Sequence, residues 1–225
     1  MKIEEEAEKI FQGCREYWTK KASEHGAINW PPTQFENVEL NKSVVEDLLR
    51  GFPGDLSKAV VMDFGCGEGR LIPYIAPKVA RYIGVDASAT ACDYARKVAA
   101  IFDNAEIHEM CHAEDISGFD LKAVDLLVSW TVFQHIPHTL TNYFLKQISE
   151  GLRVGARAHI QFDWPPLHRI ERREPKLKFD AMADDDCRCR WWPEHVIWDM
   201  LSFYGLEVFE LPESESNQCW RAVKQ

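Results

Sequence analysis

The chain has 225 residues, of which 46% are hydrophobic and 28% charged, a composition typical of one globular domain with a large core. Its net charge of −10 disfavours a protein that is held on nucleic acid or on an anionic membrane by bulk electrostatics. The sequence contains no apolar run long enough for a membrane span and no apolar signal core at its acidic N-terminus, and its seven cysteines are scattered. We therefore expect a cytoplasmic domain of enzyme size with reduced thiols.

The N-terminal part is expected to form a helical cap over residues 1–52. Apolar residues at helical spacing predict an amphipathic helix over residues 3–21. A second helix is expected to begin at Asn41, interpreted as its N-cap, and to end at Gly51. The aromatic segment 30–35 between the two helices is either a packed connector or a lid over a binding site.

From residue 59 onward, short apolar runs alternate with amphipathic segments. Runs this continuous are typical of strands that are covered on both faces, and the alternation predicts a parallel, doubly wound sheet. The short polar turn between the last two strands requires an antiparallel hairpin. We expect an α/β fold with a seven-stranded, mostly parallel sheet whose last strand is antiparallel. The expected strands are 59–63, 82–86, 105–110, 125–130, 158–163, 206–211 and 219–223, and the expected helices are 71–78, 88–102, 140–152 and 193–204.

A glycine-rich stretch, Asp63–Arg70, follows the first of these strands and has glycines on alternate positions. Glycines in such a turn let backbone N–H groups approach a ligand, and the N-terminus of the helix behind it offers partial positive charge. The alternative is a tight turn with no ligand. In a doubly wound sheet, ligands bind at the carboxyl ends of the strands. Three further motifs fall at that edge: Asp86, which suits a ribose diol or a helix cap, the segment 111–116 and the segment 130–137.

Together these motifs resemble the class I S-adenosylmethionine-dependent methyltransferases, over about residues 40–163 and 191–224. The resemblance implies a Rossmann-like fold, S-adenosylmethionine as methyl donor and S-adenosylhomocysteine as product. A nicotinamide dehydrogenase is disfavoured, because its G-x-G-x-x-G motif would need glycine where Arg70 stands. Residues 53–163 would then be the cofactor-binding core, within a single methyltransferase domain that spans residues 1–225.

The resemblance also implies the cofactor contacts. Asp63 and the backbone around the turn would hold the methionyl end, Asp86 the ribose and Ala87 the face of the adenine. His112 replaces an Asp that in many members accepts a hydrogen bond from the adenine amine, so a neutral His, a backbone carbonyl or Asp115 would take over that contact. The other cofactor-binding residues implied by the resemblance are Gly65, Cys66, Gly67, Gly69, Arg70, Ala113, Glu114, Trp130 and Thr131.

Transfer of a sulfonium methyl group depends mainly on alignment of the nucleophile in a dry pocket. A general base helps when the acceptor is a hydroxyl or an ammonium group, and His135 is the candidate; a histidine that shapes its loop is the alternative. His159 is expected to be a core residue and His138 a helix cap. The sequence predicts no metal site.

Acceptor recognition is expected outside the matched core. Residues 164–190 form an insertion that would act as a substrate lid, and residues 191–225 complete the sheet. The insertion carries a basic cluster that would either grip an anionic acceptor or form a solvated helix face, followed by an acidic turn, Asp184–Asp186. Trp191 and Trp192 would either wall the acceptor or pack in the core. The basic residues are Arg169, Arg172, Arg173, Lys176 and Lys178.

We predict transfer of a methyl group to oxygen of a small metabolite or of a glycan- or lipid-linked acceptor. The alternatives are methylation of a protein or of an amine, and a module that binds S-adenosylmethionine or S-adenosylhomocysteine without turnover. Nucleic acid is not expected as a partner, and the sequence does not indicate an oligomeric state.

Overall fold

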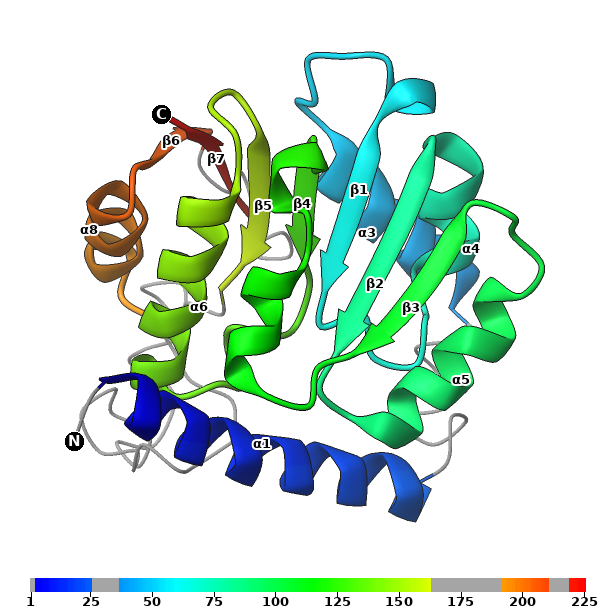
Figure 1. Cartoon of the computed structure of the whole chain (residues 1–225). Helices are drawn as coiled ribbons and strands as arrows, with labels where there is room; N and C mark the ends of the chain where they lie inside the picture. Colours follow the sequence, from blue (N-terminus) through cyan, green and yellow to red (C-terminus); the bar gives the residue numbers. More distant parts are fainter. Residues whose placement is uncertain (1–2, 26–36, 163–191, 211–218) are drawn as a thin grey trace, which may run out of the picture.

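A seven-stranded sheet forms the middle layer of the molecule (Figure 1). The structure is a computed structural model that describes residues 3–25, 37–162, 192–210 and 219–225. The strand order is β3-β2-β1-β4-β5-β7-β6, in which β1 to β5 are parallel and β7 runs antiparallel to both of its neighbours. This confirms the predicted fold, including the terminal hairpin. The strands are β1 (Val60–Phe64), β2 (Arg81–Asp86), β3 (Ala105–Glu109), β4 (Leu126–Ser129), β5 (Arg157–Gln161), β6 (Leu206–Glu210) and β7 (Cys219–Lys224).

Helices cover both faces of the sheet and give it two cores. Successive side chains of a strand point to opposite faces. Met62 and Phe64 of β1 therefore pack with one set of helices, whereas Val61 packs with the other. The first set contains α6 (His138–Gly151), α8 (Glu194–Phe203) and the 3-10 segments η3 (Ala113–Gly118) and η4 (Leu121–Ala123); the second contains α3 (Val38–Leu49), α4 (Ile72–Ile75) and α5 (Ala89–Ala99).

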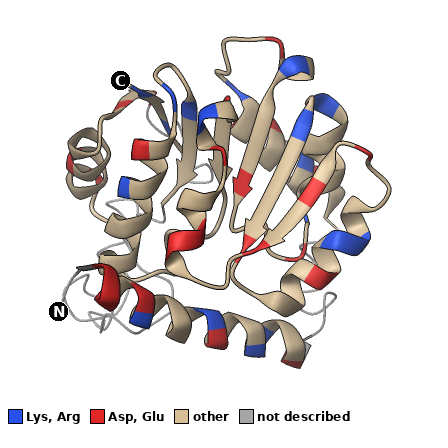
Figure 2. Cartoon of the chain, viewed as in Figure 1, with Lys and Arg blue, Asp and Glu red and all other residues tan. Residues whose placement is uncertain are grey.

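The long helix α1 (Ile3–His25) crosses the carboxyl ends of the strands, as Figure 1 shows. Its inner face buries Ala7, Phe11 and Cys14, and the Phe11 ring meets the Phe144 ring of α6 edge to face at 6.1 Å. Acidic and basic residues follow one another along the rest of α1 (Figure 2). The apolar stripe thus fixes the helix above the edge at which the sequence motifs were expected.

Two helix predictions were wrong in detail. The helix α3 is capped by Asn37, whose side chain accepts a hydrogen bond from Leu40 N at 3.0 Å, whereas Asn41 lies buried inside the helix. The helix expected over 71–78 is divided into the four-residue α4 and a 3-10 turn, η2 (Ala76–Lys78). Pro77 accounts for the break, because a proline in a helix interior removes a backbone donor. A single helical turn offers little dipole, so an anionic ligand here must rely on other donors.

His159, which the sequence predicts as a core residue, and Trp192, for which core packing was one of two alternatives, both lie in the core. His159 is fully buried, and its Nδ1 lies 2.6 Å from the carbonyl oxygen of Leu48; burial lowers its pKa to about 4. Trp192 is also buried, and its indole N–H donates to Phe133 O at 3.1 Å. Both residues therefore serve packing. Among the helices of the described residues, none is both long and apolar enough to cross a membrane.

Candidate active site

A cavity of about 520 Å³ lies between α1 and the carboxyl ends of β1, β2 and β4. This volume falls in the range of roughly 300–1,000 Å³ that is typical of small-molecule sites. The cavity is lined by the turn after β1, the end of β2, the segment after β4 and the inner face of α1. It brings together ten of the residues predicted from the sequence, which are Asp63, Gly65, Cys66, Gly67, Arg70, Asp86, Ala87, Trp130, Thr131 and His135.

The glycine turn, residues 65–69, needs glycine for two different reasons. Gly65 has φ 77°, and a Cβ there would lie 2.2 Å from Val132 Cγ2, so the turn can only close against the segment after β4 without a side chain. Gly67 has φ 56° and open space where its Cβ would be, so its backbone is accessible from the cavity. Gly69 does not line the cavity; a Cβ there would lie 3.0 Å from Ala95 Cα, so this glycine allows the turn to pack on α5.

Asp63 lies at the floor of the cavity and is only 2% exposed. Its Oδ2 accepts a hydrogen bond from the Tyr82 hydroxyl at 2.6 Å. Burial raises the pKa of Asp63 to about 6, although the Tyr82 hydroxyl and the Arg70 guanidinium act in the opposite direction. A cation that binds beside a buried carboxylate of this kind stabilises its ionised form.

Asp86 closes the turn from the end of β2. Its Oδ2 accepts a hydrogen bond from Gly67 N and its Oδ1 one from Ser88 N, both at 2.8 Å. Burial raises the pKa of Asp86, while these backbone donors lower it. Because a carboxylate can accept about four hydrogen bonds, Asp86 keeps acceptor capacity for a ligand hydroxyl beside its backbone donors. Ser88 also caps α5, since its Oγ accepts from Ala91 N at 3.2 Å.

Glu68 was missed as a site residue, although it stands between two glycines of the motif. It lines the cavity half-buried, and burial together with the Asp86 carboxylate raises its pKa to about 7. Three acids therefore surround the turn, with Arg70 beside them and Lys21 of α1 as the second basic residue that lines the cavity. This balance favours a ligand that carries positive charge.

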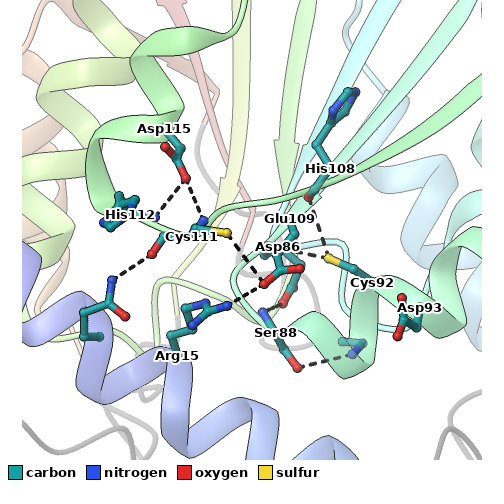
Figure 3. Close-up of polar contacts among 12 residues, drawn as sticks. Arg15, Asp86, Ser88, Cys92, Asp93, His108, Glu109, Cys111, His112 and Asp115 are labelled. Carbon is teal, nitrogen blue, oxygen red and sulfur yellow. Dashed lines mark hydrogen bonds and ion pairs between the residues drawn. The ribbon is translucent and has the colours of Figure 1, made fainter.

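The motif after β3 contacts α1 and itself, not the cavity (Figure 3). His112 is exposed, and its Nδ1 lies 2.9 Å from Glu8 Oε1; Ala113 N donates to Glu8 Oε2 at 2.8 Å. The Asp115 carboxylate accepts from the backbone N–H groups of residues 111 and 112. His112, Ala113 and Glu114 do not line the cavity, and Met110 is the residue of this segment that does. The adenine contacts implied for these three positions stay predictions.

The segment after β4 forms the opposite wall. Trp130, Thr131 and His135 line the cavity, and the turn is closed by His135 N, which donates to Val132 O at 2.7 Å. The His135 ring lies edge to face with the Trp18 ring of α1 at 5.1 Å, and its Nε2 is 3.3 Å from Gln134 Nε2. The structure thus places the candidate base in the cavity, and its role in proton transfer stays a prediction.

The α1 wall could not be located from the sequence. Phe11, Cys14, Trp18, Lys21 and Ala22 line the cavity, but they form a helical stripe that looks like any core-facing stripe. Only the crossing of α1 over the strand ends reveals their place. The aromatic segment 30–35, the insertion 164–190 with its basic cluster and Asp184–Asp186, and Trp191 lie outside the described residues.

The sheet order, the antiparallel β7 and an acidic glycine turn at the carboxyl edge define a class I, Rossmann-like methyltransferase fold. Residues 61–155 match the family model described as "Methyltransferase domain". These findings confirm the resemblance that the sequence shows, and S-adenosylmethionine is the methyl donor of this class. The matched stretch contains the glycine turn and all three later motifs. No curated protein sequence matches the chain.

Solved structures of methyltransferases are similar to the chain over most of its length. Magnesium protoporphyrin IX methyltransferase from Synechocystis PCC 6803, with bound S-adenosylhomocysteine, is 17% identical, with a TM-score of 0.66 over 94% of this chain and 98% of that one. A TehB-like S-adenosylmethionine-dependent methyltransferase from Corynebacterium glutamicum is 19% identical, with a TM-score of 0.61 over 92% and 100%. Phosphoethanolamine N-methyltransferase 1 from Haemonchus contortus is 16% identical, with a TM-score of 0.63 over 95% and 48%. At these identities the likeness establishes the fold.

Proposed function

We propose that the protein transfers a methyl group from S-adenosylmethionine to an oxygen atom of a small metabolite or of a glycan- or lipid-linked acceptor. The observation that carries this proposal is the composition of one cavity. It joins the acidic glycine turn of the matched methyltransferase domain to a histidine on the opposite wall. The two elements are the parts that methyl transfer to a hydroxyl requires, a site for the donor and a base for the acceptor.

The residues around the turn suit the donor. S-adenosylmethionine, when bound, supplies a methyl group that is already activated by the sulfonium. Ionised Asp63 would hold the ammonium group of the methionyl end, and the accessible backbone at Gly67 would lie against that end. Asp86 keeps acceptor capacity for the ribose hydroxyls, and Ala87 would pack on the adenine. The three acids complement the net positive charge of the sulfonium form, and the neutral product would bind with less electrostatic attraction.

The walls exclude water and orient the acceptor. Phe11 and Trp18 of α1 cover the cavity from above, and Trp130 and Thr131 form the wall near the methionyl arm. Holding two reactants in line in such a pocket can supply roughly 7–11 kcal/mol of the barrier reduction. His135 would accept the proton of the acceptor hydroxyl, which adds about 10²–10⁴-fold in rate. A hydroxyl acceptor would use that base, as would the ammonium group of the alternative amine acceptor, and the label experiment below distinguishes the two.

The proposal of a small acceptor rests on the size of the cavity and on the names of similar solved structures. Two of the similar structures are named for small molecules, magnesium protoporphyrin IX and phosphoethanolamine. We propose that the chain forms a single methyltransferase domain in which residues 1–52 cap the site and 164–190 act as a lid for the acceptor.

Transfer of label tests the proposal. The protein is incubated with methyl-labelled S-adenosylmethionine and a small-molecule extract, and in parallel with a protein fraction and an amine fraction. We expect label in a small molecule whose methyl group is attached to oxygen, and no transfer by an Asp86→Ala variant. Label on protein or amine would support the alternative acceptors. Tight binding of S-adenosylmethionine without any transfer would identify a non-catalytic binding module.

A further inference from the structure

The backbone at Thr131, in the wall of the cavity, adopts a conformation that its residue type disfavours. Among the described residues it is the one non-glycine position with positive φ, at 61°. A β-branched residue in this left-handed region is an outlier, and such positions persist only where the surroundings enforce them. The Thr131 hydroxyl donates to the carbonyl oxygen of the preceding Trp130 at 2.6 Å, which is a local contact and cannot fix the segment relative to the sheet.

The contact that ties Thr131 to the sheet comes from β5. The Thr131 backbone N–H donates to Gln161 Oε1 at 2.6 Å. Gln161 is the last residue of β5; it pairs with Cys219 of β7, and the preceding Ile160 pairs with Ser129 of β4. This register places Gln161 beside the point where the chain leaves β4. Gln161 is half-buried and does not line the cavity.

The conformation of Thr131 determines where the next residues lie. Val132 packs against Gly65 so closely that a Cβ on the glycine would lie 2.2 Å from Val132 Cγ2. Val132 O then accepts from His135 N at 2.7 Å, which fixes the turn that carries the candidate base. A change in φ at Thr131 would therefore displace both the contact with the glycine turn and the His135 ring.

We propose that Gln161 is a positioning residue, which clamps Thr131 in the left-handed conformation and thereby holds the segment 130–135 against the glycine turn in a form ready to bind cofactor. This inference deepens the proposed function and rests on it for its activity readout. Gln161 acts through Thr131 and touches neither the cavity nor a ligand placed in it.

A substitution cycle between the two positions tests the clamp. Gln161→Met removes the acceptor oxygen at nearly constant side-chain volume, whereas Gln161→Glu retains an acceptor oxygen. Thr131→Gly provides a background in which a backbone φ near +60° at residue 131 carries no conformational penalty. Gln147→Met is the matched control, because Gln147 also accepts a side-chain hydrogen bond, from Ser117 Oγ at 2.9 Å, but on α6. Dissociation constants for S-adenosylhomocysteine are measured by calorimetry, and amide exchange at residue 131 is measured by NMR.

We expect Gln161→Met to weaken S-adenosylhomocysteine binding about tenfold in the Thr131 background and less than twofold in the Thr131→Gly background. Amide exchange at residue 131 should accelerate at least tenfold in Gln161→Met, while Gln161→Glu and Gln147→Met stay within threefold of wild type in both measurements. Wild-type affinity and slow exchange in Gln161→Met would overturn the proposal, as would an equal loss in both backgrounds. If the wild type binds no S-adenosylhomocysteine, the proposed function fails, but the exchange comparison still decides whether the clamp exists.

Discussion

Asp63 should lower the stability of the ligand-free protein at neutral pH, and Asp63→Asn should remove that cost. Burial raises the pKa of this carboxyl from 3.8 to about 6. One pKa unit corresponds to 1.36 kcal/mol, so ionised Asp63 costs the folded state at most about 3 kcal/mol above pH 7. The asparagine loses the charge-assisted bond from the Tyr82 hydroxyl, which offsets about 1 kcal/mol. We expect a net gain of about 2 kcal/mol at pH 8.

The gain should depend on pH in a defined direction. A carboxyl whose pKa is higher in the folded than in the unfolded state favours folding below pH 3.8, where it is protonated in both states. That contribution is lost as the pH rises through about 6, so the advantage of Asp63→Asn should be small near pH 4 and complete above pH 7. Denaturant unfolding of both proteins between pH 4 and pH 8 measures the difference in their free energies of unfolding. In thermal unfolding at pH 8, the midpoint temperature of Asp63→Asn should be about 4–8 °C higher than that of the wild type.

One control variant and one further readout make this prediction specific. Asp55→Asn removes an exposed carboxyl whose pKa is lowered by hydrogen bonds from Ser57, so it should not stabilise the protein at pH 8. Asp63→Asn should also lose cofactor affinity while it gains stability. An Asp63→Asn protein that is less stable than wild type at pH 8, or equally more stable at every pH, would refute the electrostatic account of this site.

The remaining predictions concern the turn, the candidate base and the pH dependence of binding. Gly65→Ala should destabilise the protein by about 2–4 kcal/mol, because the new methyl group meets Val132 and φ is positive. The control Gly13→Ala, which has open space around its position in α1, should stabilise the protein slightly. Equal effects of the two variants in denaturant unfolding would contradict this prediction. His135→Ala should reduce methyl transfer by about 10²–10⁴-fold and leave S-adenosylhomocysteine affinity within threefold, and an unchanged turnover number would exclude the base role. S-adenosylmethionine affinity should fall up to tenfold per pH unit below about pH 6, as Asp63 becomes protonated, and calorimetry should show a flat profile there for Asp63→Asn.

The fold and the residues at the strand ends could be predicted from the sequence, because both depend on local patterns. The continuous apolar runs and the alternation of strand and helix fix a doubly wound sheet, and parallel strands bring Asp63, Asp86 and Trp130 to one edge whatever the packing details. The two helix errors arose where a second signal competed with the first. Asn37 and Asn41 are both possible caps, and Pro77 interrupts a pattern that is otherwise helical.

The rest of the site depends on contacts between distant segments, which no local pattern encodes. The place of Trp18 above His135 follows from the path of α1 across the sheet, and the partner of Thr131 lies 30 residues away at the end of β5. The turn of His112 toward Glu8 is likewise a long-range contact between α1 and the segment after β3. Glu68 is different, since its place between two glycines was visible in the sequence and only its burial revealed its electrostatic role.

A crystal structure of the protein with S-adenosylhomocysteine tests the central claim most directly. We predict that the ligand fills the cavity beneath α1, with its amino group beside Asp63, its ribose hydroxyls on Asp86 and its sulfur facing Trp130, Thr131 and His135. A ligand bound elsewhere, or no ligand in crystals grown at millimolar S-adenosylhomocysteine, would contradict the assignment of this cavity to the methyl donor.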